Sequence, residues 1–311
     1  MTAALASPAP PPAPSPPPPP ATRTRGGSRL AMLAAAVTVV LWASAFVAIR
    51  AIGDAYSPGA LASGRITIAA LVLGGIALYY RRPLPRGRPL LLVVGYGVAW
   101  FAGYMVVLNL AQQHLDAGTA AMLVNLAPIL VAISAGLLLG EGFSRWLLTG
   151  IGVAFVGTII IATGGTGGGS VNEGIGIVLG IVTAVLYAAG VLAQKVALRS
   201  VDVLSATFLG CAVGAIVLLP FSVDFVQQTM SAPGAAIAGV VYLGIFPTAI
   251  AFNLWAYALS RSDAGRLSAT TLTVPAIAVG LSWLLLGELP TVLGMIGGAL
   301  CLLGVAISRR R

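Results

Sequence analysis

The chain has 311 residues, of which 58% are hydrophobic and only 8% are charged, and its mean hydropathy is +0.99. Soluble domains carry about a quarter charged residues, so this composition excludes a soluble enzyme or binding domain and indicates an integral membrane protein. The formal net charge of +9 would by itself allow a nucleic-acid partner. Cys211 and Cys301 lie in separate apolar runs; they are too few for a disulfide framework and lack metal-site spacing.

The amino-terminal residues 1–29 differ in composition from the rest of the chain. The run PAPPPAPSPPPPP is followed by Arg23, Arg25 and Arg29. Such a proline-rich segment cannot build a core, so we expect a disordered or polyproline II tail. The apolar run that follows is longer than the hydrophobic region of a cleaved signal peptide, and we interpret it as a membrane span.

Apolar runs long enough to cross a bilayer, which needs about 20 residues per helix, recur along the chain. They do not alternate polar and apolar residues as barrel strands do. The predicted fold is therefore an all-α integral membrane protein with ten transmembrane helices joined by short connections such as DAYSPG and SAPG. The ten predicted spans are 31–52, 58–80, 89–110, 117–139, 144–163, 174–194, 203–221, 234–259, 264–286 and 290–308.

Lysine and arginine residues fall almost entirely on one side of these spans. Of the 17, 15 lie in the two tails and in every second connection, Arg50 lies on the opposite side, and Arg65 falls inside the second span. The positive-inside rule then places both termini in the cytoplasm of a protein in the bacterial inner membrane. The basic residues are topology signals, so we expect a lipid bilayer around the protein and no nucleic-acid partner.

Residues 116–141 are repeated 147 positions later. DAGTAAMLVNLAPILVAISAGLLLGE aligns with DAGRLSATTLTVPAIAVGLSWLLLGE, and the same offset pairs Gly150 with Gly297 and Gly157 with Gly304. Five spans per copy is an odd number, so the second copy enters the membrane in the opposite orientation. Inverted repeats of this kind build many secondary transporters.

The repeat predicts five segments. They are a cytoplasmic proline-rich tail (1–29), a first five-helix repeat (30–163), an external glycine-rich linker (164–173), a second five-helix repeat (174–308) and a basic cytoplasmic end (309–311). The linker sequence GGTGGGS lacks the Gly-Lys-Ser/Thr of a phosphate-binding loop, so we expect neither ATP nor another cofactor.

Several features together resemble a known family. The Trp42-x-Ser44-x-Phe46 start, the arginine of the second span and the P…LLGE ending of the fourth, in a five-plus-five arrangement, resemble the drug/metabolite transporter superfamily, EamA type. The resemblance covers nearly all of 30–308. Within that superfamily the chain is similar to bacterial amino-acid and metabolite exporters, including the aromatic amino acid exporter branch. The resemblance implies export of a small-molecule substrate such as an amino acid.

Two prolines are predicted near the middle of the membrane. Pro128 and Pro275 each lie about eleven residues into their spans, which corresponds to roughly 16 Å of helical rise. Corresponding interruptions in the two halves of a transporter point to its binding site, so both prolines are predicted helix hinges. Kinks satisfied by neighbouring helices are the alternative.

Aromatic, amide and basic side chains at membrane depth form the predicted substrate cavity. Aromatic residues usually gather at the interfaces, so rings at mid-depth favour a cavity, although helix packing would also explain them. A carboxamide in hydrocarbon needs a partner, either in the bundle or on a ligand. Arg65 could bind a carboxylate or extend toward the outer surface. The predicted cavity residues are Trp42, Arg65, Trp100, Tyr104, Asn125, Tyr187, Phe246, Asn253 and Tyr257, the last three on one heptad-spaced face.

The leading hypothesis is a secondary transporter that works by alternating access. No Asp or Glu lies inside a predicted span, which disfavours proton-coupled export of cationic drugs and leaves facilitated diffusion or exchange open. Glu141 and Glu288, at span ends, are predicted interfacial anchors. A channel or a multidrug exporter is the alternative. An intramembrane enzyme would need a nucleophile with a base at membrane depth, and the single histidine, His114, lies in a connection, so we expect no enzyme.

Overall fold

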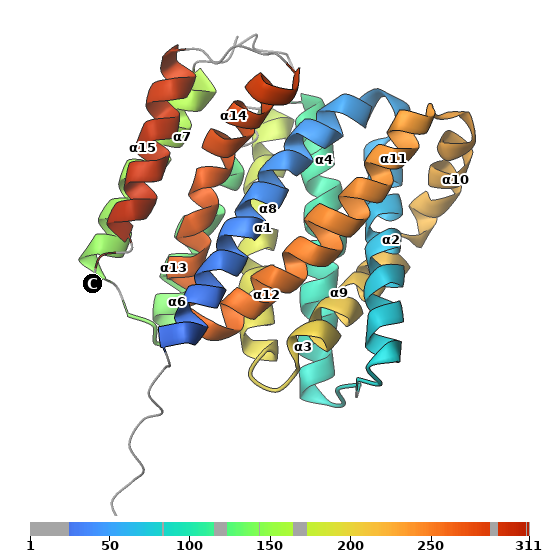
Figure 1. Cartoon of the computed structure of the whole chain (residues 1–311), viewed down its shortest axis with the longest axis horizontal. Helices are drawn as coiled ribbons and strands as arrows, with labels where there is room; N and C mark the ends of the chain where they lie inside the picture. The colour runs from blue at the N-terminus through green and yellow to red at the C-terminus, as the bar shows by residue number, and fades with distance from the viewer. Residues whose placement is uncertain are drawn as a thin grey trace, which may run out of the picture.

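The computed structural model describes residues 25–82, 84–114, 123–142, 144–163, 173–286, 292–308 and 310, and the regular structure of these residues is helical (Figure 1). The proline-rich run, residues 164–172 of the predicted linker, and Glu288 lie outside the described residues. The predictions made for them are therefore not tested by the structure.

Six helical segments in the described part of the chain are long and apolar enough to cross a membrane. They are Arg29–Ile49, Pro58–Tyr79, Arg88–Ala111, Gly174–Ala197, Gly234–Arg261 and Ala264–Leu285. A seventh candidate is the pair Val203–Val217 and Leu219–Ser231, bent by 61°, and three shorter apolar helices are Ala127–Leu138, Arg145–Gly157 and Met295–Ser308. The molecule is thus a multi-pass helical membrane protein, and each of these segments overlaps one of the predicted spans.

The first two helices are joined by a tight corner. Helix α1 (Arg25–Ile52) passes through the 3-10 turn η1 (Gly53–Ala55) into α2 (Pro58–Tyr79). The hydroxyl of Ser57 accepts a hydrogen bond from the backbone N–H of Ala60 at 3.4 Å, and proline follows at the first helical position. This is the usual chemistry of a helix start, since the cap satisfies a free N–H and proline has none to lose.

Two long helices widen into a π-helix at their middle. In one, α3 (Arg88–Tyr96) continues through η2 (Gly97–Tyr104) into α4 (Met105–His114). In the other, α11 (Gly234–Leu243) continues through η4 (Gly244–Ile250) into α12 (Ala251–Arg261). The first residues of the two π segments are 147 positions apart, which is the offset of the sequence repeat. Short π segments inside α-helices are rare and frequently mark functional sites.

The two predicted hinge prolines stand at helix starts. Pro128 is the second residue of α6 (Ala127–Leu138), directly after a turn at Asn125 and Leu126. Pro275 is the second residue of α14 (Val274–Leu286), which follows α13 (Ala264–Ser268) and the 3-10 segment η5 (Ala269–Thr273). A turn precedes α6, whereas α14 continues directly from η5, with the backbone N–H of Val274 donating to the carbonyl of Thr271. An irregular segment thus precedes each proline, and the role of the two prolines as hinges stays a prediction.

Helices α7 (Arg145–Thr163) and α15 (Val292–Ser308) pack against each other through glycines, at the left of Figure 1. A Cβ atom built on Gly150 would lie 2.4 Å from the backbone oxygen of Gly304, and one on Gly157 would lie 2.5 Å from that of Gly297. These contacts join the beginning of one helix to the end of the other, so the helices run antiparallel. Glycine permits this close approach of two backbones.

A helix that the sequence did not predict connects α9 (Val203–Val217) to α11. After the turn η3 (Leu219–Phe221), the chain forms α10 (Ser222–Ser231), which lies beside α2 (Figure 1). Phe221 and Phe225 pack on Gly59 and Gly64 of α2, where added Cβ atoms would lie 2.3 Å from each ring. The expected short connection is therefore wrong here, because two aromatic anchors bind this polar segment to the bundle.

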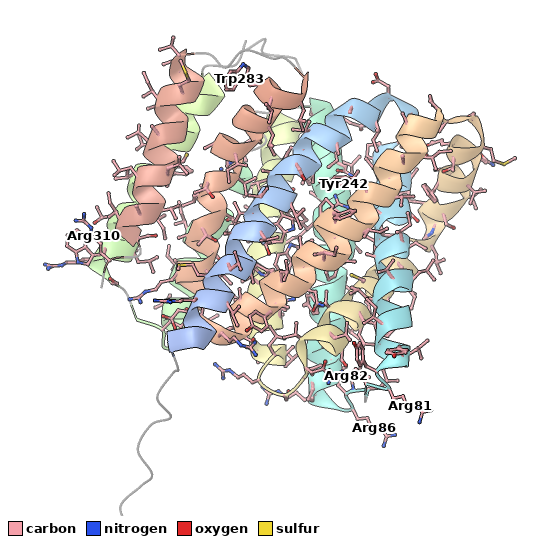
Figure 2. The ribbon with its side chains drawn as sticks, viewed as in Figure 1. Arg81, Arg82, Arg86, Tyr242, Trp283 and Arg310 are labelled. Atoms are coloured by element: carbon pink, nitrogen blue, oxygen red, sulfur yellow. The ribbon has the colours of Figure 1, made fainter. Side chains whose placement is uncertain are left out.

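Three of the basic residues labelled in Figure 2 lie toward one end of the molecule. Arg81, Arg82 and Arg86 follow the end of α2, whereas Trp283 of α14 lies at the opposite end. Arg310 lies at the left edge of the molecule, beyond the lower end of α15, and α1 begins at the lower end (Figures 1 and 2).

Candidate functional site

An aromatic cluster occupies the centre of the bundle. The ring of Trp42 on α1 lies 5.0 Å from Trp255 and 5.1 Å from Phe252, both on α12. Trp100 on η2 lies 5.1 Å from Phe252 and 5.1 Å from Tyr187 on α8 (Glu173–Ala197). Helices from both ends of the sequence therefore meet at these rings.

The cluster contains four of the predicted cavity residues. Tyr104 joins it through Tyr187, with ring centres 5.8 Å apart, beside Trp42 and Trp100. The sequence analysis missed Phe252 and Trp255. These two flank the predicted Asn253, and aromatic side chains on either side of an amide in an apolar helix were the available signal.

The π segment η4 is held by side chains of α1. The indole nitrogen of Trp42 donates to the carbonyl of Pro247 at 3.2 Å, and the hydroxyl of Thr38 lies 3.2 Å from the carbonyl of Ala251. A π segment shifts the regular helical hydrogen bonds, and buried carbonyls need other donors. The Trp42 indole supplies one such donor, whereas the single hydroxyl hydrogen of Thr38 is shared with the carbonyl of Ala34 in its own helix, 2.8 Å away.

Arg65 of α2 points into the bundle at the same π segment. Its side chain is 6% exposed, and its Nε and Nη2 atoms lie 3.1 and 3.0 Å from the hydroxyl oxygen of Thr248. Thr248 donates its own hydrogen to the carbonyl of Leu243 at 2.7 Å, so its oxygen accepts from the guanidinium. In the described part of the chain no carboxylate forms an ion pair with Arg65. A buried cation without an anion is unfavourable, and a bound anion would relieve this cost.

Corresponding contacts recur at the other π segment. Trp42 contacts Pro247. Tyr187 lies 145 positions after Trp42, and Trp100 lies 147 positions before Pro247. These two residues also contact each other. A Cβ on Gly244 would lie 3.0 Å from the backbone oxygen of Arg65, and one on Gly97 would lie 2.9 Å from that of Gly210.

Chemically, however, the two places differ. The position that corresponds to Arg65 is Gly210, and the hydroxyl end of Tyr96 covers it, since an added Cβ would lie 2.3 Å from the Tyr96 oxygen. Tyr96 donates to the carbonyl of Ala206 at 2.7 Å. The positive charge is therefore present at one π segment and replaced by a phenol at the other.

The remaining predicted cavity residues lie in different surroundings. Asn125 is buried, at the turn before α6, and the carboxamide oxygen of Asn253 is buried without a hydrogen-bond partner among the described residues. The guanidinium carbon of Arg261 lies over the ring of Tyr257, 3.8 Å from the ring centre. Phe246 is 44% exposed and stacks on Tyr242, so it lies outside the aromatic cluster. The π segment changes the helical register between Phe246 and Asn253, which separates them from the common face expected for a regular helix.

A cavity of about 530 Å³ opens at the end of the bundle opposite Arg81 and Arg82. It lies where α1 ends and α2 begins, next to the end of α4 and to α10. None of the nine predicted cavity residues lines it.

Toward the opposite end, charged side chains of other segments hold the junction of α12 and α13. The Glu141 carboxylate accepts hydrogen bonds from the backbone N–H groups of Ala264 at 2.9 Å and Gly265 at 3.2 Å. The Lys195 ammonium donates to the carbonyls of Leu259, at 2.7 Å, and Ser262. An acid at a helix start and a base at a helix end both complement the helix dipole. Glu141, expected as an interfacial anchor, thus caps a helix.

An all-helical membrane bundle with paired irregular helices and a buried, unpaired cation at its centre defines a membrane transporter. The EamA-like transporter family matches residues 29–163 and 174–310, and the chain belongs to this family. This confirms the predicted resemblance to the EamA type of the drug/metabolite transporter superfamily.

Similar proteins cover almost the whole chain. A probable terminal-alkyne amino-acid exporter of Streptantibioticus cattleyicolor is 35% identical over 283 residues, which are 90% of this chain and 94% of the relative. The uncharacterized transporter YdfC of Bacillus subtilis is 30% identical, covering 89% and 90%. A probable amino-acid metabolite efflux pump of Salmonella typhimurium is 24% identical, covering 88% and 93%. A solved crystal structure, 21% identical over 91% of this chain and 98% of its own, superposes with a TM-score of 0.76 and supports the fold.

Proposed function

We propose that the protein exports amino acids, or closely similar metabolites that carry a carboxylate, across the bacterial inner membrane by alternating access. The observation that carries this proposal is the buried guanidinium of Arg65, whose one hydrogen-bond partner among the described residues is the Thr248 hydroxyl. A carboxylate is the anion that arginine binds most specifically, through two parallel hydrogen bonds.

The aromatic cluster supports a substrate with an apolar side chain. Trp42 bonds to η4, and Phe252 packs against both Trp42 and Trp100. The guanidinium of Arg65 bonds to Thr248 in the same π segment. An apolar cavity with a few placed polar groups is the usual form of a small-molecule site. The relatives named as a terminal-alkyne amino-acid exporter and an amino-acid metabolite efflux pump support the same substrate class.

The proposed architecture is two inverted five-helix halves with ten spans and both termini in the cytoplasm. Three observations support it: the family matches the chain twice, the π segments are 147 positions apart, and α7 meets α15 in antiparallel orientation through glycines. The excess of lysine and arginine in alternate connections supports the cytoplasmic side. Rocking of one half against the other would expose the Arg65 region to each side in turn.

Counterflow in proteoliposomes tests the proposed function. Vesicles are loaded with an unlabelled amino acid, and uptake of the same labelled compound is followed for L-phenylalanine, L-alanine and L-propargylglycine. A carrier gives saturable uptake of at least one of these, accelerated several-fold by substrate inside the vesicle. Vesicles without protein and vesicles loaded with sorbitol are the controls.

Flux that rises linearly with concentration and does not respond to internal substrate would contradict the carrier and favour a channel. Saturable counterflow of phenethylamine but of no amino acid would contradict the role of Arg65, because phenethylamine has no carboxylate.

A further inference from the structure

The cavity of about 530 Å³ has the size of a small-molecule site but lies away from the aromatic cluster. Its walls come from the end of α1, the corner before α2, the end of α4 and helix α10. Figure 1 shows these elements at the upper end of the bundle, away from the arginines labelled at the lower end of Figure 2. By the proposed topology this is the outer face, where an exported substrate leaves.

The polar groups of the cavity wall favour a cation. Among the described side chains of the lining, Asp54 is the one that is ionised, and none is a lysine or an arginine. The Asn109 carboxamide donates through its nitrogen to the carbonyl of Pro58 at 2.9 Å, a bond that does not use its oxygen. A carboxylate and a carboxamide oxygen are both acceptors, and together they suit the three donors of a primary ammonium group.

Helix α10 completes the cavity from the side. The carboxamide oxygen of Gln228 accepts a hydrogen bond from the backbone N–H of Ser57 at 2.8 Å, which fixes α10 against the corner before α2. The same corner carries Tyr56, also in the wall, whose ring stacks on Phe225 of α10 at 5.9 Å. The wall is therefore built by specific contacts.

The cavity is connected through two helices to the proposed carboxylate site. Leu61 lines the cavity and precedes Arg65 by one helical turn on α2. Asn109 lies on α4, which continues the π segment that carries Tyr104. At the opposite end of the bundle, Glu141 and Lys195 hold the junction of α12 and α13. The larger cavity thus lies on the side of Asp54, and hydrogen bonds hold the junction of α12 and α13 at the other end.

We propose that this cavity is an exit site that binds the primary ammonium group of the substrate through Asp54, after the carboxylate has left Arg65. This inference rests on the proposed function, since it treats the ligand as an exported amino acid. It assigns the two charged groups of a zwitterion to two places: the carboxylate to the buried arginine and the ammonium to the outer cavity. Because Asp54 is exposed, binding is weak and release is fast.

Direct binding of two half-substrates tests the exit site without requiring transport. Phenethylamine keeps the ammonium of phenylalanine and lacks the carboxylate, whereas hydrocinnamate keeps the carboxylate and lacks the ammonium. Titration of the purified protein in an amine-free detergent is expected to show phenethylamine binding that weakens about two- to fivefold in Asp54→Asn, the usual effect of removing one partner of an exposed ion pair. Hydrocinnamate binding is expected to be equal in both proteins.

A matched control is Asp224→Asn, which removes an exposed acid of α10 that does not line the cavity. Phenethylamine affinity should be unchanged in this variant. Absence of phenethylamine binding to the natural protein, or equal weakening in both variants, would overturn the exit site.

The source of the ammonium is tested in proteoliposomes. Inhibition of L-phenylalanine counterflow by external phenethylamine is measured in vesicles of phosphatidylcholine and phosphatidylglycerol, with and without phosphatidylethanolamine. Weaker inhibition of Asp54→Asn in both lipid mixtures supports the substrate as ligand, and an effect confined to vesicles with phosphatidylethanolamine would overturn it in favour of a lipid headgroup. Asp54-dependent binding without any amino-acid counterflow would contradict the proposed function while the ammonium site stands.

Discussion

The charge of Arg65 decides the chemistry of the central site. Membrane-embedded arginines generally pair with acids or reach the headgroups, yet this guanidinium is buried and bonded to a hydroxyl. Thr248 cannot neutralise it. In the proposed function this charge is satisfied when the carboxylate of the substrate enters.

Replacing Arg65 by glutamine should lower L-phenylalanine counterflow at least tenfold, because the carboxylate loses a charge-assisted hydrogen bond. Initial rates in proteoliposomes measure this effect. Arg86→Gln removes an exposed arginine and is expected to leave the rate unchanged. A rate for Arg65→Gln equal to that of Arg86→Gln would contradict the carboxylate role.

At the residue scale, the sequence identified several aromatic residues of the cluster, but it did not predict which residues they contact. Trp42, Trp100, Tyr104 and Tyr187 could be selected because rings at membrane depth are unusual, and they do share one cluster. The position of Phe246 outside this cluster was not visible in the sequence, because its orientation depends on a π segment that hydrophobic periodicity does not reveal. Its place in the cavity stays a prediction. Spacing along a regular helix was the wrong measure there.

The irregular helices carry the architecture at the scale of elements. Both π segments and both proline-led helices recur at the offset of 147, so the interruptions belong to the repeated unit. The sequence predicted that offset from the match between residues 116–141 and 263–288, in which the two prolines coincide. Proline pre-sets the backbone of a first helical turn, so the preceding turn absorbs the interruption.

Helix α10 is an element that the sequence did not predict at all. Its residues are mixed polar and apolar, so neither a transmembrane length nor a strict pattern predicts it. It forms because Phe221 and Phe225 find glycines on α2, and such a pairing of distant positions is not visible in one local stretch of sequence.

The position of Pro275 predicts a small effect of its removal. Pro275→Ala should change the melting temperature in detergent by no more than about 4 °C, since at most one hydrogen bond, to a carbonyl of η5, can be gained at the first turn. Ala278→Pro, one turn later in α14, should lower it strongly, because proline inside a helix costs about 3 kcal/mol. Similar melting temperatures for the two variants would contradict the assignment of Pro275 to a helix start.

At the scale of the whole molecule, the two proposed halves meet where equivalent helices are in contact. The sequence offset pairs Gly150 with Gly297 and Gly157 with Gly304, whereas the contacts join Gly150 to Gly304 and Gly157 to Gly297. This exchange of partners is what a two-fold axis between α7 and α15 produces, because each helix then presents the same two glycines to the other. One small-residue pattern therefore forms both sides of the contact.

Replacing a glycine of α7 by alanine is expected to have opposite effects at two positions, because only one of them lies against the backbone of α15. An added Cβ on Gly157 would lie 2.5 Å from the Gly297 oxygen, whereas one on Gly152 would meet nothing within 4 Å. Gly157→Ala should therefore destabilise the protein by about 1–3 kcal/mol through overpacking. Gly152→Ala should stabilise it by up to about 1 kcal/mol through higher helix propensity. Thermal unfolding of the purified variants separates these signs, and a stabilising Gly157→Ala would show that α7 and α15 do not pack this closely in solution.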